Sequence, residues 1–374
     1  MNDTIRTLFL AAQHYTYLNS AAVSPMPVTA IKAIISQLVD VASNGSSGYV
    51  GWVDTKNRAR ELIAGMMNVR ADQVAFLRNT SDGFASIASG INWHAGDNIV
   101  SFAAEFPANF YPWRRVRDEL GVELRLCPER NGRIDLDEFL SLIDARTKVV
   151  AISSVQFGSG FRADLRRIGE AARAVDALFC VDIIQGLGAM PYDLPADLVD
   201  AASGASHKWL CAPEGCGVLY LSDRARERIK PTLVGWISVE NPWDFNDREQ
   251  PFRSTALAWE SGTGCSSLFY GLEQSLKLLT DTGIANIAGY LEGLTDHLCG
   301  RLDQSKYEVV SSRRQGEKSQ IVCLRHRGGL PANKIAADLE KRKIIVSPRA
   351  DRLRIAPHFY NNVDDIERLV AALP

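Results

Sequence analysis

The chain has few of the features that commit a protein to a compartment or a large partner. Its 374 residues carry a net charge of only −2, so no overall attraction to nucleic acid or to an anionic membrane is indicated. No stretch approaches the roughly 18 uninterrupted apolar residues that a membrane-spanning helix needs. The apolar run at residues 8–12 is too short for the core of a secretory signal. We therefore expect a cytoplasmic protein that binds neither membranes nor nucleic acid.

Cysteine and histidine are also sparse and scattered. The seven cysteines are an odd number without a C-x-x-C pair, which favours reduced, mostly buried thiols over a disulfide framework. The six histidines show no H-E-x-x-H or comparable ligand spacing. We expect no structural or catalytic metal.

The middle of the chain alternates between strand-like and helical patterns. Residues 163–177 follow helical spacing, with charges opposite the apolar face and Asp164 placed to cap the start. Strand and helix alternating at this spacing predict right-handed crossovers and an α/β fold with a mostly parallel, doubly wound sheet. The strand-like runs are apolar enough to be buried on both faces: 98–104, 148–157, 177–184 and 217–221.

The last third of the chain has a different rhythm. A long helical pattern over 266–304 precedes short strand-like runs and a terminal helix from Val363. The length also exceeds what one hydrophobic core usually supports. We expect a large domain over 18–255 and a small α/β domain made of 1–17 and 256–374.

Sheets of this kind bind ligands at the carboxyl ends of their strands, and the run 177–184 places Asp182 at such an end. An ionised carboxylate in apolar surroundings costs several kcal/mol unless a cation or strong donors pair with it. A positive group should therefore meet Asp182. The alternative is an aspartate at the wet end of the strand that caps the next loop.

Lys208 stands in a stretch, 203–217, that has almost no other charge. Its neighbours Trp209 and Leu210 would desolvate an ammonium group and lower its pKa, which is typical of a lysine nucleophile. The alternative is a surface lysine whose amine stays in solvent.

Four polar residues, 79–82, follow an apolar stretch and precede a helix-compatible run. Hydroxyls and free backbone N–H groups at a helix start form an anion site suited to a phosphate, although a plain helix cap is the alternative. Neither the G-x-x-x-x-G-K-[ST] nor the G-x-G-x-x-G motif is present. A nucleoside triphosphate or a dinucleotide is therefore disfavoured, and with it a nicotinamide-dependent dehydrogenase.

Two further residues stand where they could meet a ligand. Phe106 comes just after the run 98–104, where a ring can lie flat on a planar molecule, although ordinary core packing would also explain it. Arg354 lies in a β-like run and could clamp a carboxylate, or form a salt bridge to a neighbouring strand. Together, these positions describe a planar ligand with a phosphate, a ring nitrogen and an aldehyde that lysine can capture. That ligand is pyridoxal 5′-phosphate (PLP).

Nearly the whole chain resembles the class V aminotransferase family of fold-type I PLP-dependent enzymes, which includes cysteine desulfurases, selenocysteine lyase, kynureninase and isopenicillin N epimerase. The most specific motifs are NTSDG, VDIIQGLGAMPYD, SHKWL and SGTG. The phrases YLNSAAVSP, EFPANFYPW and HKWLCAPEG look closest to the isopenicillin N epimerase-like branch. The resemblance implies a fold-type I transferase that acts as a homodimer.

The resemblance also assigns roles around the cofactor ring. Lys208 would form the Schiff base, or internal aldimine, and shuttle protons. Asp182 would hold the pyridinium nitrogen, and Gln185 would hydrogen-bond the phenolic oxygen. Phe106 would stack on the ring, and His207 would lie close to the phosphate.

The phosphate itself would be shared between two subunits. Thr263 would reach the phosphate of the neighbouring subunit. Some family members have their serine at the position of Ala205, so either Ser203 or Ser206 could be the serine that touches phosphate here. The resemblance implies these ligands within one chain: Asn79, Thr80, Ser81 and Ser206.

Arg354 matches the family arginine that binds the substrate α-carboxylate, but the segment before it departs from one branch. Desulfurases have a persulfide-forming cysteine in a mobile loop shortly before this arginine, whereas 324–374 contain no cysteine. Cys323 lies well upstream in a strand-like run. A sulfur-relay desulfurase is therefore disfavoured, but cleavage of a C–S bond without a persulfide is not.

The expected reaction starts with an amino acid anchored by Arg354 and loses the Cα proton to Lys208, leaving a carbanion. An aminotransferase-like enzyme is the first expectation, a C–S or other β-lyase of the cysteine or selenocysteine lyase kind the second, and an epimerase the third. A PLP-binding regulatory module is the non-enzyme alternative, against which the intact set of site residues argues. Trp236 and Trp243 would line the substrate entrance, or else belong to the core or a dimer contact.

Overall fold

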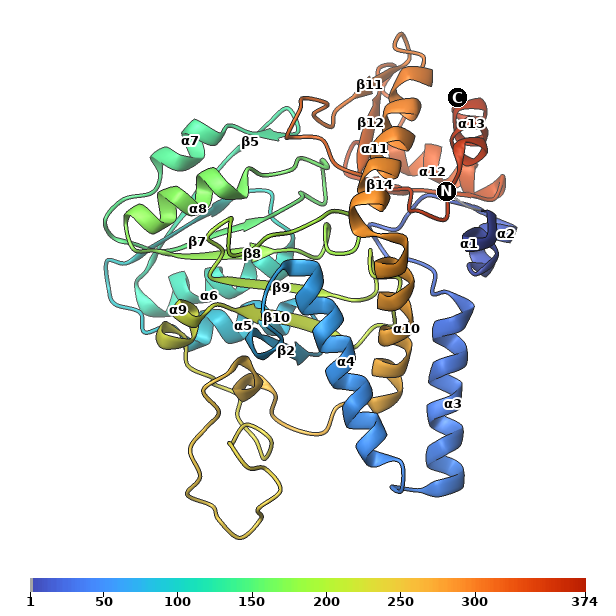
Figure 1. Ribbon diagram of the computed structural model, residues 1–374. Helices are drawn as coiled ribbons and strands as arrows, with labels where there is room; N and C mark the ends of the chain where they lie inside the picture. Colours follow the sequence, from blue (N-terminus) through green and yellow to red (C-terminus); the bar gives the residue numbers. More distant parts are fainter. Residues whose placement is uncertain (1–2) are drawn as a thin grey trace.

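The structure is a computed structural model that describes residues 3–374, and its largest element is a seven-stranded sheet (Figure 1). The strand 217–221 is antiparallel to both of its neighbours and the other four pairings are parallel, so the expected mostly parallel sheet is confirmed. The strands lie in the order β2 (Val74–Leu77), β10 (Gly217–Leu221), β9 (Ala201–Ala205), β8 (Leu178–Asp182), β7 (Thr147–Ser153), β3 (Asn98–Phe102) and β4 (Glu123–Cys127).

Alternate residues of each strand point to opposite faces of the sheet, and apolar side chains are buried on both faces. In β8, Val181 belongs to one cluster of buried apolar side chains and Cys180 to the other. The helix expected over 163–177 is present as α8, and Asp164 caps it by accepting from the Arg167 N–H at 3.1 Å. One face packs against α5 (Thr80–Gly90), α6 (Tyr111–Leu120) and α9 (Asp223–Arg228), and the other against α8 (Leu165–Ala174).

A second sheet, four-stranded and antiparallel, forms from the C-terminal part of the chain. The helix predicted over 266–304 is instead two helices, because Gly283 between them has a φ of 85°, outside the helical region. The strands lie in the order β11 (Tyr307–Val309), β12 (Val322–His326), β15 (Arg352–Ile355) and β14 (Ser347–Arg349). The helices of this part are α10 (Ser266–Thr282), α11 (Ile284–Arg301), α12 (Ala332–Lys341) and α13 (Val363–Ala372).

The start of the chain contacts its end, since β1 (Thr16–Tyr17) pairs with β13 (Ile344–Ile345). Two long helices, α3 (Val28–Asn44) and α4 (Tyr49–Met67), pack along α10 (Figure 1). The domain division expected at residue 255 stays a prediction. The remaining elements are short: α1 (Asp3–Thr7), α2 (Leu10–His14), α7 (Leu136–Ser141), β5 (Glu129–Arg130), β6 (Arg133–Ile134) and the 3-10 turns Ala71–Gln73, Pro107–Asn109 and Ala256–Trp259.

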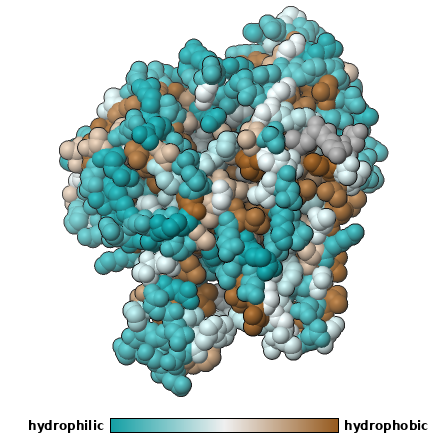
Figure 2. Space-filling view, in the orientation of Figure 1, coloured by the Kyte–Doolittle hydropathy of each residue, from teal (hydrophilic) through white to brown (hydrophobic). Residues whose placement is uncertain are grey.

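Residues 230–255 form a long loop that extends away from the sheet (Figure 1). Its aromatic side chains Trp243, Phe245 and Phe252 are exposed, as is Leu38 on α3. Figure 2 shows hydrophobic patches on this side of the molecule among mainly hydrophilic side chains. None of the helices in residues 3–374 combines the length and apolarity that crossing a membrane requires.

Candidate active site

A pocket of about 320 Å³ lies where β8 and β9 end, and we call it the strand-end pocket. The carboxyl ends of parallel strands open on the same edge of the sheet, as the sequence analysis assumed. The structure brings nine of the predicted site residues to its wall: Asn79, Thr80, Ser81, Phe106, Asp182, Gln185, His207, Lys208 and Arg354.

Asp182 is the last residue of β8 and is only 1% exposed. Its Oδ1 accepts a hydrogen bond from the Ile184 N–H at 2.9 Å, whereas Oδ2 is buried without a partner among the described residues. Burial raises the pKa of Asp182, and the nearby charge of Lys208 opposes that rise. A buried oxygen without a partner is what the N–H of a ring nitrogen would satisfy.

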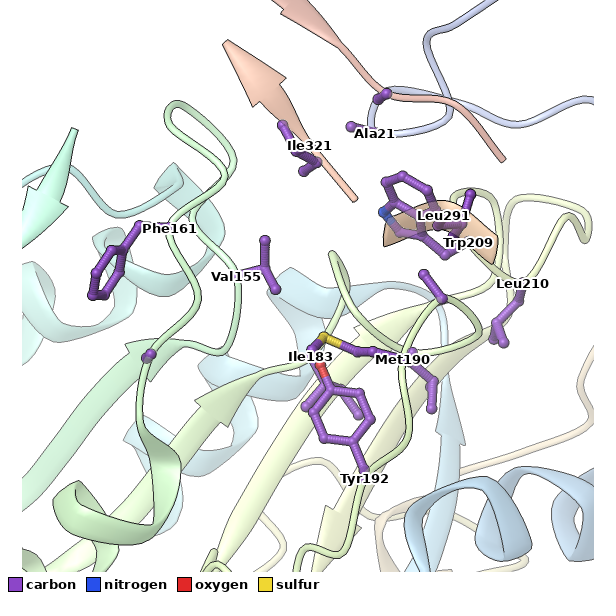
Figure 3. Packing of buried hydrophobic residues seen from close by; sticks show 14 of the residues in the cluster. Ala21, Val155, Phe161, Ile183, Met190, Tyr192, Trp209, Leu210, Leu291 and Ile321 are labelled. Carbon is purple, nitrogen blue, oxygen red and sulfur yellow. The ribbon is translucent and has the colours of Figure 1, made fainter. Parts of the chain in front are cut away.

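Lys208 follows β9 and is 7% exposed, so desolvation lowers the pKa of its amine, with Asp182 opposing. Its Nζ lies 5.2 Å from the centre of the Phe106 ring. Trp209 is fully buried among the apolar side chains of Figure 3. The Trp209 indole N–H donates to Gln185 Oε1 at 2.9 Å, and His358 donates to the Trp209 carbonyl at 2.9 Å. These contacts fix the backbone that presents the lysine.

Phe106 comes after β3 and is 39% exposed at the pocket. Its ring meets the edge of Phe157 at 5.1 Å between ring centres, which orients it. The residue before it, Glu105, is buried and accepts from the Ser153 N–H at 2.7 Å and from Gln156 Nε2 at 2.7 Å. Glu105 thereby ties the Phe106 segment to the end of β7. Glu105 was missed in the sequence, although it directly follows the predicted strand run 98–104 and a carboxylate at a strand end was the signal for Asp182.

The start of α5 forms the opposite wall. Asn79 caps this helix, because its Oδ1 accepts from the Asp82 N–H at 2.9 Å. The helix cap that was the alternative to a phosphate site is therefore present. Thr80 Oγ1 is buried and has no hydrogen-bond partner within residues 3–374. Ser81 is exposed at the pocket. The free hydroxyl next to the helix start suits an anion.

The two candidate serines are hydrogen-bonded to backbone carbonyls. Ser203 Oγ donates to the carbonyls of Thr80 at 3.2 Å and Val218 at 3.1 Å. Ser206 Oγ donates to the Pro213 carbonyl. Both are fully buried, and neither lines the pocket. Each hydroxyl proton is used inside the fold in this arrangement, and which of the two serines touches the phosphate stays a prediction.

Thr263 also lies outside the strand-end pocket. It is exposed and lines a separate cavity of about 220 Å³ together with Trp236 and Trp243. Within one chain it therefore does not join the other predicted residues.

Arg354 on β15 is 1% exposed and donates through Nη1 to the Phe157 carbonyl at 3.1 Å. Its Nε and Nη2 have no partner, and no carboxylate within residues 3–374 forms an ion pair with it. The salt-bridge alternative is therefore wrong for the described part of the chain. Burial lowers the pKa of this guanidinium, and the charge of Arg349 adds to the effect.

Arg349 lines the strand-end pocket as well and was missed in the sequence. It reaches the pocket because β14 and β15 form a tight hairpin in which it pairs with Arg352 across a turn of two residues. No cysteine lies in this hairpin. Cys323 is fully buried, its thiol donates to the Gly158 carbonyl at 3.4 Å, and burial raises its pKa to about 11.

These atoms fit PLP. Asp182 Oδ2, Thr80 Oγ1 and two nitrogens of Arg354 are buried without partners in one pocket, beside a desolvated lysine amine. Unsatisfied buried groups are rare and call for a ligand or ion. A ring nitrogen, a phosphate, a substrate carboxylate and an aldehyde would satisfy them in turn.

Comparison with known proteins identifies the family. The sequence model described as "Aminotransferase class-V" matches residues 16–350. A probable cysteine desulfurase of Methanothermobacter thermautotrophicus is 26% identical over 98% of this chain and 96% of its own length. The uncharacterized aminotransferase YcbU of Bacillus subtilis is 23% identical over 98% and 96%.

Solved structures have the same fold. The cysteine desulfurase of Thermococcus onnurineus NA1 has a TM-score of 0.89 at 21% identity, covering 99% of this chain and 96% of the other. The cystine C-S lyase C-DES, in complex with its product cysteine persulfide, has a TM-score of 0.89 at 22% identity over 97% and 98%. The isopenicillin N epimerase-like branch stays a prediction. Since the family model covers most of its length, the chain belongs to the class V aminotransferase family of PLP-dependent enzymes.

Proposed function

We propose that the protein is a PLP-dependent lyase that cleaves a C–S or other bond at Cβ of an α-amino acid without a persulfide intermediate. The observation behind this proposal is a pocket in which a lysine amine, an unpaired carboxylate and an unpaired arginine meet while no cysteine of the described residues lines it. Many of the relatives are named cysteine desulfurases, and one similar structure is a cystine C-S lyase. These names favour the lyase over the aminotransferase that we expected first.

Each residue of the strand-end pocket has a task in this reaction. When bound, PLP supplies an aldehyde for the amine and a ring that accepts the electron pair released at Cα. Asp182 would hold the proton on the ring nitrogen, and Phe106 would cover the ring and exclude water. Thr80, with the N-terminus of α5, would bind the phosphate. Gln185 has a second amide hydrogen beyond its bond to the Ala21 carbonyl, which suits the phenolic oxygen.

Lys208 and Arg354 act on the substrate. Arg354 orients the amino acid through its α-carboxylate, with the fork geometry that suits two oxygens. Lys208 Nζ takes the proton from Cα, because a desolvated amine is neutral in a larger share of molecules and so can act as a base. The electron pair left on Cα forms a Cα=Cβ double bond as the C–S bond breaks. The sulfur leaves with the bonding electrons and a proton that Lys208 returns.

Transamination is the second candidate, and the relatives named as uncharacterized aminotransferases favour it. It would use the same amine and the same arginine, with the proton returned to the cofactor side. Epimerisation is the third, and a non-catalytic PLP-binding module the last. A cytoplasmic location stays a prediction.

We also propose a homodimer in which Thr263 reaches the phosphate in the neighbouring subunit. Thr263 is exposed and does not line the strand-end pocket of its own chain, which supports a role in another chain. Exposed apolar residues on α3 and on the loop 230–255 are available for such a contact.

Product analysis tests the function. The PLP-loaded enzyme is incubated with L-cysteine, L-cystine and the common L- and D-amino acids, with and without a 2-oxo acid. The lyase yields pyruvate, ammonia and a sulfur product without a 2-oxo acid. Alanine with enzyme-bound sulfur would instead identify a desulfurase, and a new amino acid that depends on the 2-oxo acid an aminotransferase. Inverted substrate would identify an epimerase, and PLP binding without any product a regulatory module.

A further inference from the structure

Three arginines share one face of the hairpin formed by β14 and β15, and they differ in what neutralises them. Ser347 pairs with Arg354 and Arg349 pairs with Arg352, and side chains two residues apart on a strand point the same way. Arg349, Arg352 and Arg354 therefore project from the same face. This concentration of positive charge needs partners, because like charges on adjacent strands repel.

Only one of the three has a protein carboxylate. Arg352 forms an ion pair with Glu129 through both terminal nitrogens and also donates to the Gly158 carbonyl at 3.3 Å. Arg354 donates only to a carbonyl, as described above. Arg349 Nη1 donates to Ser347 Oγ at 2.6 Å and to the Pro348 carbonyl at 2.7 Å, and it forms no ion pair with any acid of residues 3–374.

The two unneutralised arginines both line the strand-end pocket. Asp182 is the one carboxylate among the lining residues of this pocket, and it is assigned to the ring nitrogen. No acid of the pocket wall is thus left for either arginine. The half-buried position of Arg349 adds to the cost of leaving its charge unpaired.

A single α-carboxylate would neutralise Arg354, and the phosphate is assigned to Thr80 and the start of α5, so Arg349 would keep no counter-ion of its own. We propose that Arg349 binds a second anionic group on the substrate side chain, so that the enzyme acts on amino acids with acidic side chains. The group would be a carboxylate or a sulfinate, since both offer oxygens to the guanidinium fork. This inference rests on the proposed function, because it assumes that Arg354 holds the α-carboxylate.

Unreactive acids test the binding step apart from catalysis. The PLP-loaded full chain is titrated by calorimetry with succinate and glutarate and, as matched monoanions, with butyrate and valerate. Wild type should bind the dianions at least about tenfold more tightly, as a charged hydrogen bond to the second group predicts. Arg349→Gln should remove most of this preference, and Arg349→Lys should retain part of it. Arg327→Gln, at an exposed arginine outside the pocket, should keep the full preference.

Amino acids extend the test to substrates. The spectral change of bound PLP is followed with L-aspartate against L-asparagine, L-glutamate against L-glutamine, and L-cysteine sulfinate against L-cysteine. Wild type should favour the acidic member of each pair, and Arg349→Gln should lose the preference at equal PLP content and unchanged circular dichroism. Equal weakening of monoanions and dianions by Arg349→Gln would overturn the proposal, as would a wild type that favours neutral ligands.

The two proposals fail separately. Selective binding of dianions without turnover of any amino acid would leave the Arg349 site standing and refute the lyase. Turnover of neutral sulfur amino acids without a preference for acidic ones would refute the Arg349 site and leave the lyase standing.

Discussion

Replacing Arg354 with methionine should separate recognition of the substrate from binding of the cofactor. The change removes the guanidinium but keeps a flexible apolar side chain of similar length in a site that is 1% exposed. Inside the protein it costs one hydrogen bond, the 3.1 Å bond to the Phe157 carbonyl, worth about 1 kcal/mol. It also removes a buried charge without a partner, which offsets that loss. We therefore expect a folded protein with normal PLP content.

The loss should appear in substrate binding. The free Nε and Nη2 of Arg354 can donate two charged hydrogen bonds to a carboxylate. At about 1.5–3 kcal/mol each, these amount to about 3–6 kcal/mol, or a weakening of at least about 100-fold. The assay compares KM for L-cysteine with KM for cysteamine, which has the amine and the thiol but no carboxylate. Arg354→Met should raise KM for L-cysteine by about 100-fold or more and change KM for cysteamine by no more than about threefold.

Arg327→Met is the matched control, since that arginine is exposed and outside the pocket. If Arg354→Met weakened both compounds by the same factor, the arginine would support the fold of the pocket and would not bind the carboxylate. If neither changed, the carboxylate would lie elsewhere, and the orientation of the substrate would have to be revised.

Lys208→Ala should keep the fold and noncovalent PLP but abolish covalent attachment, so that borohydride reduction followed by mass spectrometry finds no modified peptide; labelling at another lysine would show that the nucleophile is misassigned. Cys323→Ala should leave turnover with L-cysteine within about twofold, because the thiol is buried against a carbonyl; loss of sulfur release would point to a persulfide relay. Glu260→Gln should destabilise the protein by about 3–5 kcal/mol in urea denaturation, since Glu260 is buried between Arg60 and Lys56. These two cations lower the folded pKa of Glu260 to about 2, so its stabilising contribution is present above an unfolded pKa of about 4.3 and is lost as pH falls toward 2. The wild type should therefore lose its advantage over Glu260→Gln in acid, and a constant difference from pH 7 down to pH 2 would refute the assignment.

The site residues that were easiest to predict from the sequence lie at the end of a strand or soon after it. Asp182 ends β8, Phe106 follows β3, and Lys208 follows β9. For such residues the position along the chain also determines the position at the sheet edge, because parallel strands end on one side. Apolar runs and their boundaries are local properties that can be recognised without knowing the fold.

The features that the sequence did not reveal depend on pairing register, on single hydrogen bonds and on backbone angles, which apolar runs do not encode. Arg349 reaches the pocket through the register of the β14–β15 hairpin, which the short strand-like runs in the last third of the chain did not define. The hydrogen bond from the Ser206 hydroxyl to the Pro213 carbonyl could not be read from the sequence, and the role of Ser206 at the phosphate stays a prediction. Gly283 looked like part of a helix because its neighbours have helical spacing on both sides, and only its φ of 85° separates α10 from α11.

The distribution of satisfied and unsatisfied groups argues for a binding site that is still in use. The groups that support the pocket are paired: Glu105 accepts from Ser153 and Gln156, and Trp209 donates to Gln185. Three residues that line the pocket, Asp182, Thr80 and Arg354, each have at least one buried side-chain atom without a partner among the described residues. Each unpaired buried group costs about 1–3 kcal/mol, which a purely structural role would not explain. Because a ligand that satisfies them binds the folded state and not the unfolded chain, PLP should stabilise the protein as well as equip it for catalysis.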